Sequence, residues 1–168
     1  LAYDSSSGRI SGYFEDCTGW DASTQSPQFC CSFYFTGILE GKQCTIYSFY
    51  PSDSAADLIT GTFELISNKS CKIKLQQEHG GCSNVRHFSD SAQVFNLVNA
   101  ENWTQIRFVT LQKTYFYSSP SLKNKMKTYL LKNDWVCIHK VIEDWAYCSY
   151  FGKKTTKAWI KLSDLNKN

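Results

Sequence analysis

The sequence predicts a mainly β protein that is stapled by disulfides. Its 168 residues include ten Tyr, eleven Phe and five Trp. These residues occur with Thr, Val and Ile in short runs that Gly, Asn, Asp, Ser and Pro interrupt, which is typical of strands and turns. The chain also holds eight Cys, an even number that indicates disulfide bonds and therefore an oxidising compartment. Helical periodicity is nearly absent, so we expect antiparallel sheets.

Eleven segments have the composition of strands: 10–15, 29–35, 43–50, 59–66, 71–76, 105–111, 114–117, 127–131, 135–141, 145–150 and 157–162. Two further segments, 53–58 and 89–100, each predict a helical turn or a short helix. Ser89 or Asp90 would be the N-cap of the second.

The clearest hairpin is predicted over residues 62–75. Phe63 and Leu65 fall on one face of the first strand, because successive side chains of a strand point to opposite faces. Cys71, Ile73 and Leu75 share a face of the second strand in the same way. The polar segment 67–70 would form the turn. This alternation predicts a sheet with one face on a core.

The cysteine spacing favours disulfides over metal. Structural zinc sites use pairs of ligands two to four residues apart, and no such pairs occur here. Cys30 and Cys31 are adjacent, so their side chains should point to opposite faces of a strand and serve different bridges. We interpret all eight as half-cystines and predict no metal site: Cys17, Cys30, Cys31, Cys44, Cys71, Cys82, Cys137 and Cys148.

The pairing is predicted most directly for Cys137 and Cys148, because a hairpin that turns near residues 142–143 would place them opposite each other. The six cysteines before them admit fifteen pairings, which the sequence leaves open. A local Cys71–Cys82 bridge is one candidate. It would leave Cys17, Cys30, Cys31 and Cys44 to pair among themselves.

The last third of the chain carries a series of short motifs in a defined order. It reads KTYFYSSP from residue 113, KTYLLKNDWV from residue 127, DWAYCSYF from residue 144 and KAWIKLSDL from residue 157. In this order, residues 113–165 resemble a bacterial Src-homology-3-like (SH3-like) domain. The matching positions include Tyr115, the turn at 132–134, Trp145 and Trp159. Asn133 stands where the family usually has Gly, and Asn accommodates a left-handed turn.

The resemblance implies a small SH3-like β-barrel over residues 112–168, after a cysteine-rich antiparallel β domain over residues 1–111. It also implies an aromatic groove for peptides or cell-wall fragments. The candidate contact residues are Trp135, Tyr115, Tyr117, Trp145 and Tyr150.

Trp135 is the candidate that we favour, because Val136 and Ile138 occupy the opposite phase of its strand and would face the interior. An exposed Trp of this kind is typical of binding hot spots. We interpret Trp159 and Tyr129 as core residues.

No residue is predicted to be catalytic, and no cofactor is expected. SH3-like domains in bacteria often accompany wall hydrolases with a Cys nucleophile and a His base, but that chemistry needs a Cys at the start of a helix. No cysteine here precedes a convincing helix. His79, His87 and His139 lack a second His at ligand spacing and a nearby nucleophile motif. The carboxylates form no motif that would select a glycosidase pair.

Charge and hydropathy also restrict the partners. The net charge is +3, with basic and acidic residues interleaved. No basic stripe or nucleic-acid-binding motif is evident, so we expect no nucleic-acid partner. No apolar run approaches the roughly 18 residues of a membrane span. The chain opens on Leu1, which fits an exported chain whose signal peptide has been removed.

We therefore expect a non-enzymatic, periplasmic or secreted binding protein. The hypothesis that we favour is an inhibitor or immunity protein that blocks a toxin or a cell-wall-degrading enzyme. The alternative is a peptidoglycan- or peptide-binding SH3-like module. A secreted eukaryotic effector is a third hypothesis, which the N-glycosylation patterns at 68–70 and 102–104 favour.

Overall fold

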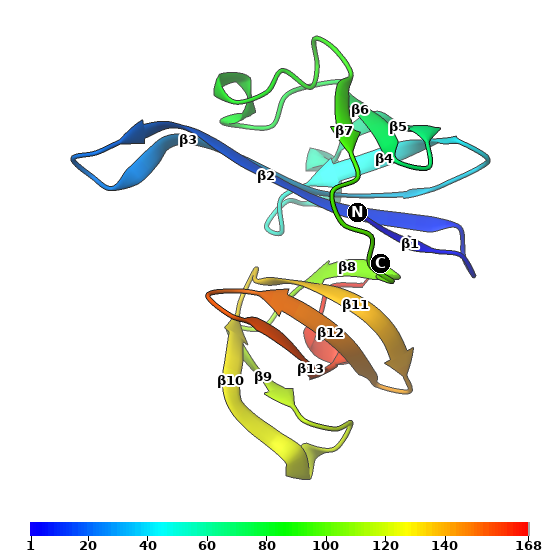
Figure 1. The fold of residues 1–168 in the computed structure, drawn as a ribbon, viewed down its shortest axis with the longest axis vertical. Coiled ribbons are helices and arrows are strands. Elements are labelled where there is room, and N and C mark those ends of the chain that lie inside the picture. The colour runs from blue at the N-terminus through cyan, green and yellow to red at the C-terminus, as the bar shows by residue number, and fades with distance from the viewer. Residues whose placement is uncertain (168) are drawn as a thin grey trace. The chain divides into compact units, whose positions relative to one another are not determined.

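The computed structural model describes residues 1–167, which fold into two units. Ser6–Ala100 form the first unit, and Leu1–Ser5 with the chain from Glu101 onward form the second. Each unit is built on an antiparallel sheet, and the only helical elements among the described residues are four single turns of 3-10 helix. The mainly β prediction is confirmed (Figure 1).

The first unit is a curled half-barrel in which each strand pairs with the next along the chain. Its strands are β2 (Arg9–Asp21), β3 (Ser26–Ile38), β4 (Gln43–Phe49), β5 (Ile59–Ser67), β6 (Ser70–Leu75) and β7 (Gln93–Asn96). Because the chain runs as a meander, alternate residues of every strand point to one shared core. Phe33, Phe63 and Phe88 are fully buried there.

The predicted hairpin over residues 62–75 is confirmed. Phe63 lies opposite Ile73, and Leu65 lies opposite Cys71. The helical turn expected at 53–58 is η1 (Ala55–Asp57), where Ser54 and Asp57 form a capping box. The short helix expected over 89–100 is wrong, because β7 forms there and completes the edge of the sheet beside β6.

The second unit contains β1 (Ala2–Asp4), β8 (Gln105–Phe108), β9 (Lys113–Tyr117), β10 (Lys125–Leu131), β11 (Trp135–Ile142), β12 (Trp145–Phe151) and β13 (Thr155–Lys161). Its six-stranded sheet has the order β10-β9-β13-β12-β11-β8. Phe116, Leu130 and Ile160 are buried in the core. Asn133 has a φ of 72°, so the left-handed turn before β11 is confirmed.

The two units meet in sequence between Ala100 and Glu101, about ten residues before the expected boundary at 111 and 112. The difference arises from β8, which the sequence assigned to the first domain. Phe108 of β8 lies opposite Trp135 of β11, so this strand completes the second sheet. The SH3-like motifs begin only at residue 113 and gave no indication of it.

Two disulfides form, and both lie in the first unit. Cys17 bonds to Cys30, which lies directly opposite on the neighbouring strand. Cys31 bonds to Cys82 in η2 (Cys82–Asn84), 51 residues away in sequence. The expectation that Cys30 and Cys31 serve different bridges is confirmed. A Cys71–Cys82 bridge is therefore wrong. Cys44 and Cys71 are both free, so the prediction that they are half-cystines is wrong too.

The predicted Cys137–Cys148 bridge is also wrong. Cys137 lies opposite Ser149, and Cys148 lies opposite Ile138, with a register shift between Ile138 and Lys140. The pairing is thus offset by one residue, so the two thiols point to opposite faces of the sheet. Both are free and fully buried. Burial raises the pKa of each thiol to about 12, which keeps both protonated and unreactive.

Peptide mapping without reduction tests this register. We expect Cys17–Cys30 and Cys31–Cys82 as the cross-linked pairs, with Cys137 and Cys148 recovered as free thiols that react with a thiol reagent only after denaturation. A Cys137–Cys148 cross-link would contradict the register of β11 and β12, since thiols on opposite faces of a sheet cannot bond without movement of the backbone.

Candidate binding site

A hairpin arm extends from the sheet of the first unit. We define it as residues 15–32, the distal parts of β2 and β3 with their turn. β3 pairs with β4 only from Tyr34 to Gly37, whereas its pairing with β2 continues to Ser26 opposite Asp21. Beyond the reach of β4, β3 is hydrogen-bonded to β2 alone. Figure 1 shows the two strands in blue, running past the other strands of this sheet.

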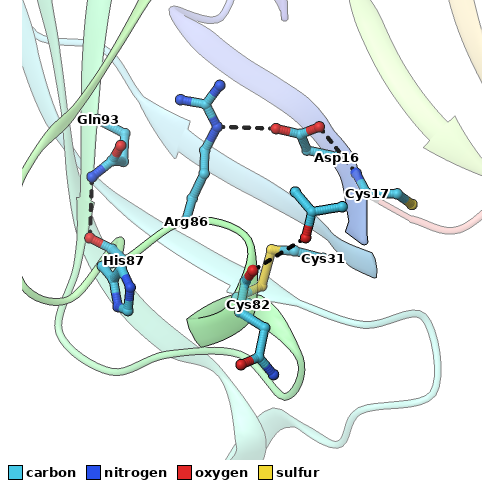
Figure 2. Close-up of polar contacts among 9 residues, drawn as sticks. Asp16, Cys17, Cys31, Cys82, Arg86, His87 and Gln93 are labelled. Atoms are coloured by element: carbon cyan, nitrogen blue, oxygen red, sulfur yellow. Dashed lines mark hydrogen bonds and ion pairs between the residues drawn. A yellow bond between two sulfur atoms is a disulfide. The ribbon is translucent and has the colours of Figure 1, made fainter. Parts of the chain in front are cut away.

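Two disulfides fix the arm. Cys17–Cys30 ties its two strands together across the hairpin. Cys31–Cys82 ties the base of β3 to η2 (Figure 2). In the chain-entropy model, loops of these lengths give about 3 and about 4 kcal/mol of stabilisation respectively. An isolated two-stranded hairpin is marginal in water, so these bonds supply order that side-chain packing does not.

Polar contacts between the arm and the η2 loop add to the disulfides. The Asp16 carboxylate lies 3.2 Å from Nε of Arg86. The Thr18 hydroxyl donates to the carbonyl oxygen of Asn84 at 3.2 Å. A partly exposed ion pair contributes at most about 1 kcal/mol. Figure 2 shows the Asp16–Arg86 contact beside the Cys31–Cys82 bond. Asp16 lies opposite Cys31, and Thr18 has the same strand phase as Asp16, so these contacts share one face of the arm. They fix the direction in which the arm leaves the sheet.

The tip of the arm presents an exposed tryptophan. Trp20 is 66% exposed, more than any other aromatic residue that the structure describes. Phe29, on the other strand, is 41% exposed. Trp20 lies opposite Pro27. Gly19, just before it, has a φ of 68°, a left-handed conformation that Gly adopts without strain. An exposed Trp has a large apolar surface that a partner could cover.

The turn that joins the two strands is held by its own side chains. The Asp21 carboxylate accepts hydrogen bonds from the backbone N–H of Ser23 at 2.8 Å and from its hydroxyl at 2.7 Å. These bonds keep the pKa of Asp21 below its ordinary value. The Gln25 amide donates to the carbonyl oxygen of Ala22 at 2.8 Å. Glu15, Asp16 and Asp21 give the arm three carboxylates, and it contains no Lys or Arg.

The hairpin arm is not evident from the sequence, in which the predicted strands leave residues 16–28 unassigned. One predicted strand ends at residue 15 and the next begins at residue 29, because residues 16–28 show no hydrophobic alternation. A two-stranded arm with solvent around it buries too little for that pattern to develop. The available signal was the spacing of Cys17 and Cys30 about a polar turn, which fits a cross-strand disulfide.

The five aromatic residues predicted to bind do not form one groove. Tyr150 is half-buried against the core of the second unit, on the inner side of its sheet. Trp135 is half-buried too, with its ring centroid 5.9 Å from that of Phe151. The interpretation of Trp135 as the exposed contact residue therefore has little support.

Tyr115, Tyr117 and Trp145 lie on the side of the sheet opposite Tyr150, and the register of β11 with β12 puts Trp135 on that side as well. Tyr117 and Trp145 pack edge to face, with centroids 4.8 Å apart. Trp159 and Tyr129 were interpreted as core residues, but Trp159 is only half-buried and Tyr129 is 47% exposed on this same side.

Two serine–histidine pairs resemble catalytic dyads, but neither has the access that a nucleophile needs. Nε2 of His79 lies 2.9 Å from the Ser48 hydroxyl, and Nε2 of His139 lies 2.7 Å from the Ser149 hydroxyl. Both serines are fully buried. The Ser48 hydroxyl donates to the carbonyl oxygen of Ile59 and hence accepts from His79. A histidine that acts as a general base would instead accept the proton of the serine hydroxyl. The hydrogen bond between Ser48 and His79 is therefore structural.

Residues 1–167 contain no group of three or more His, Cys, Asp or Glu side chains placed to hold a metal ion. Over the same residues, no helix has the length and apolar character needed to span a membrane. Comparison of the chain with protein-family models, with curated proteins and with solved structures found no match. The SH3-like resemblance of residues 113–165 therefore stays a prediction.

His79 should make stability depend on pH. Its pKa is lowered by burial, against the opposing effect of the Asp53 and Glu78 carboxylates. The unfolded chain then binds a proton more readily, so the free energy of unfolding should fall as pH drops below about 6.5, the ordinary pKa of His. Urea unfolding of the protein and of His79→Gln across this range measures the effect. We expect a shallower slope in the variant, and an unchanged slope would contradict the assignment.

Proposed function

We propose that this protein is a non-enzymatic inhibitor that acts outside the cytoplasm and blocks a wall-degrading enzyme or toxin by inserting its hairpin arm into the enzyme's cleft. The observation that carries the proposal is Trp20, exposed at the tip of an arm that two disulfides brace. An arm that is one hairpin wide can enter a cleft that the rest of the sheet cannot.

Rigidity supports this function on energetic grounds. A flexible loop loses conformational freedom when it binds, at about 0.5–1.5 kcal/mol for each side chain that becomes immobile. Cys17–Cys30 and the Asp21 turn order the arm before it meets a partner. Trp is among the residues that most often dominate binding energy at protein interfaces. The arm therefore combines a strong anchor with a low cost of ordering.

Charge narrows the class of partner. The arm carries three carboxylates and no basic residue. Asp16 pairs with Arg86 outside the arm, which leaves Glu15 and Asp21 as the charges that a partner would meet. Enzymes that degrade anionic wall polymers benefit from a positive cleft, which attracts their substrate. An acidic arm is complementary to such a cleft and would compete for it, with faster association at low salt. A hydrolase with a basic active-site cleft is thus the partner that the arm fits.

The disulfides suggest an oxidising, extracytoplasmic location. We propose the periplasm in particular, because immunity factors and inhibitors of wall hydrolases are needed where these enzymes reach the wall. The buried Ser48 and Ser149 pairs favour a binding role over catalysis.

Removal of the Trp20 side chain tests the proposal. The full chain is titrated into purified muramidase, amidase and endopeptidase while the loss of turbidity of a peptidoglycan suspension is followed. We expect inhibition of at least one enzyme, and a dissociation constant at least about 30-fold higher for Trp20→Ala, as for a hot-spot Trp. Tyr47→Ala is the matched control, since Tyr47 is an exposed aromatic residue of β4 in the same unit.

Equal inhibition by the protein and Trp20→Ala would contradict the role of the arm. Retention on peptidoglycan without inhibition of any enzyme would contradict the inhibitor proposal and favour the wall-binding alternative.

The bracing of the arm gives a second prediction. Cys17→Ser with Cys30→Ser should leave the sheet folded, because this bridge is exposed and Cys31–Cys82 is retained. The arm should then be less ordered, and inhibition should weaken through the added entropic cost. Circular dichroism checks the fold, and the same turbidity assay measures the loss. Unchanged inhibition by the folded double variant would show that the bridge does not preorganise the arm.

A further inference from the structure

A row of side chains crosses the outer side of the second unit's sheet, on five neighbouring strands. Lys125 of β10 lies opposite Tyr117 of β9, which in turn lies opposite Trp159 of β13. Trp159 lies opposite Tyr147 of β12, and Tyr147 lies opposite Lys140 of β11. Directly opposed residues share a face of an antiparallel sheet. The row therefore places three aromatic rings between two lysines, and we call the surface around it the lysine–aromatic face.

The row lies on the side of the sheet away from the main core of the unit, and on that same side Cys137 and Ser149, next to the row, are fully buried. Phe116, Ala146, Ala158 and Ile160 alternate with the residues of the row and are buried in the core. Tyr147 and Trp159 are half-buried and Tyr117 is buried, whereas Lys125 and Lys140 are exposed at the two ends. Three more lysines point to the same side of the sheet and add positive charge around the row. They are Lys113 on the strand of Tyr117, and Lys157 and Lys161 on the strand of Trp159.

Contacts with the rings hold the lysines in place. The ammonium nitrogen of Lys125 lies 3.5 Å from the ring centroid of Tyr115, and that of Lys113 lies 3.8 Å from the ring centroid of Tyr129. The Lys140 ammonium lies 5.5 Å from the Trp159 ring. Such cation–π contacts restrict flexible lysine side chains. The face therefore presents charges at fixed positions beside its rings.

The charge of the unit has the same sign. Strands β8 to β13 contain six Lys and one Arg and not a single Asp or Glu. The whole unit has twelve Lys and Arg against six Asp and Glu, a net charge of +6. Glu143 and Asp144, in the turn between β11 and β12, border the face, and so does Glu101, which acts on His139 beside Tyr147. The lysines have no acidic neighbours on their own strands and remain available to an anionic ligand.

We propose that the lysine–aromatic face binds an anionic polysaccharide, with the lysines at its carboxylate, sulfate or phosphate groups and the half-buried Tyr and Trp rings against its sugars. A repeating anionic chain matches a row with charges at both ends and apolar rings between them. The disulfides place the protein where extracellular and wall polysaccharides occur and nucleic acids are scarce. The hairpin arm belongs to the other unit, so this inference is independent of the inhibitor proposal.

The test uses the full chain and size-defined polygalacturonate, with neutral dextran and a single-stranded oligothymidylate for comparison. Trp fluorescence and titration calorimetry report binding at low salt. We expect polygalacturonate to bind, dextran not to bind, and affinity to fall steeply with salt, as for ligands held through charge. Lys125→Gln with Lys140→Gln should raise the dissociation constant at least tenfold.

The matched control is Lys153→Gln with Lys154→Gln, which removes the same charge from the exposed turn between β12 and β13. It should change the dissociation constant less than threefold. Absence of polygalacturonate binding, or equal losses in the two double variants, would overturn the proposal. Tighter binding of the oligothymidylate than of polygalacturonate would also overturn it and assign the face to single-stranded nucleic acid.

Discussion

The Cys31–Cys82 disulfide is the bond on which the candidate site depends. It joins β3, at the base of the hairpin arm, to η2, in the long connection between β6 and β7. That connection has little regular structure of its own, yet Asn84 and Arg86 hold the arm through Thr18 and Asp16. Without the covalent bond, two weak polar contacts at a protein surface would have to position both segments. With it, a two-stranded arm can keep a fixed direction and leave Trp20 free for a partner.

The two units differ in net charge, and this difference suits them to different partners. The first has six Lys and Arg against nine Asp and Glu, a net charge of −3, and its arm contains three carboxylates and no Lys or Arg. The second has a net charge of +6, with lysines on an outer face whose strands contain no Asp or Glu. An acidic arm suits a basic enzyme cleft, and a basic face suits the anionic polymer on which such an enzyme acts. Binding to the anionic polysaccharide would thus concentrate the inhibitor at the polymer that its target enzyme degrades.

Much of the fold follows from the sequence, because strands that cover a core must alternate. All eleven predicted strands occur, and the Phe63 and Ile73 pairing follows from the phase of each strand. The Cys137–Cys148 pairing failed because the hairpin turns at Glu143 and Asp144, one position later than the sequence predicted. The register shift between Ile138 and Lys140 offsets this difference only in part. The helix expected over 89–100 failed because pairing with β6 outweighs local preference. The arm was missed for the opposite reason: it buries little, so no alternation marks it. The lysine–aromatic face needs the sheet order, which places β9 beside β13.

The central claim is that the arm is rigid before it binds, and backbone ¹⁵N relaxation of the free protein tests it most directly. We expect order parameters near 0.85 for the amides of residues 15–32, as in a rigid backbone, and similar to those of β4 and β5. Values below about 0.6 along the arm would describe a flexible hairpin. They would contradict an account in which disulfides and the Asp21 turn preorganise Trp20.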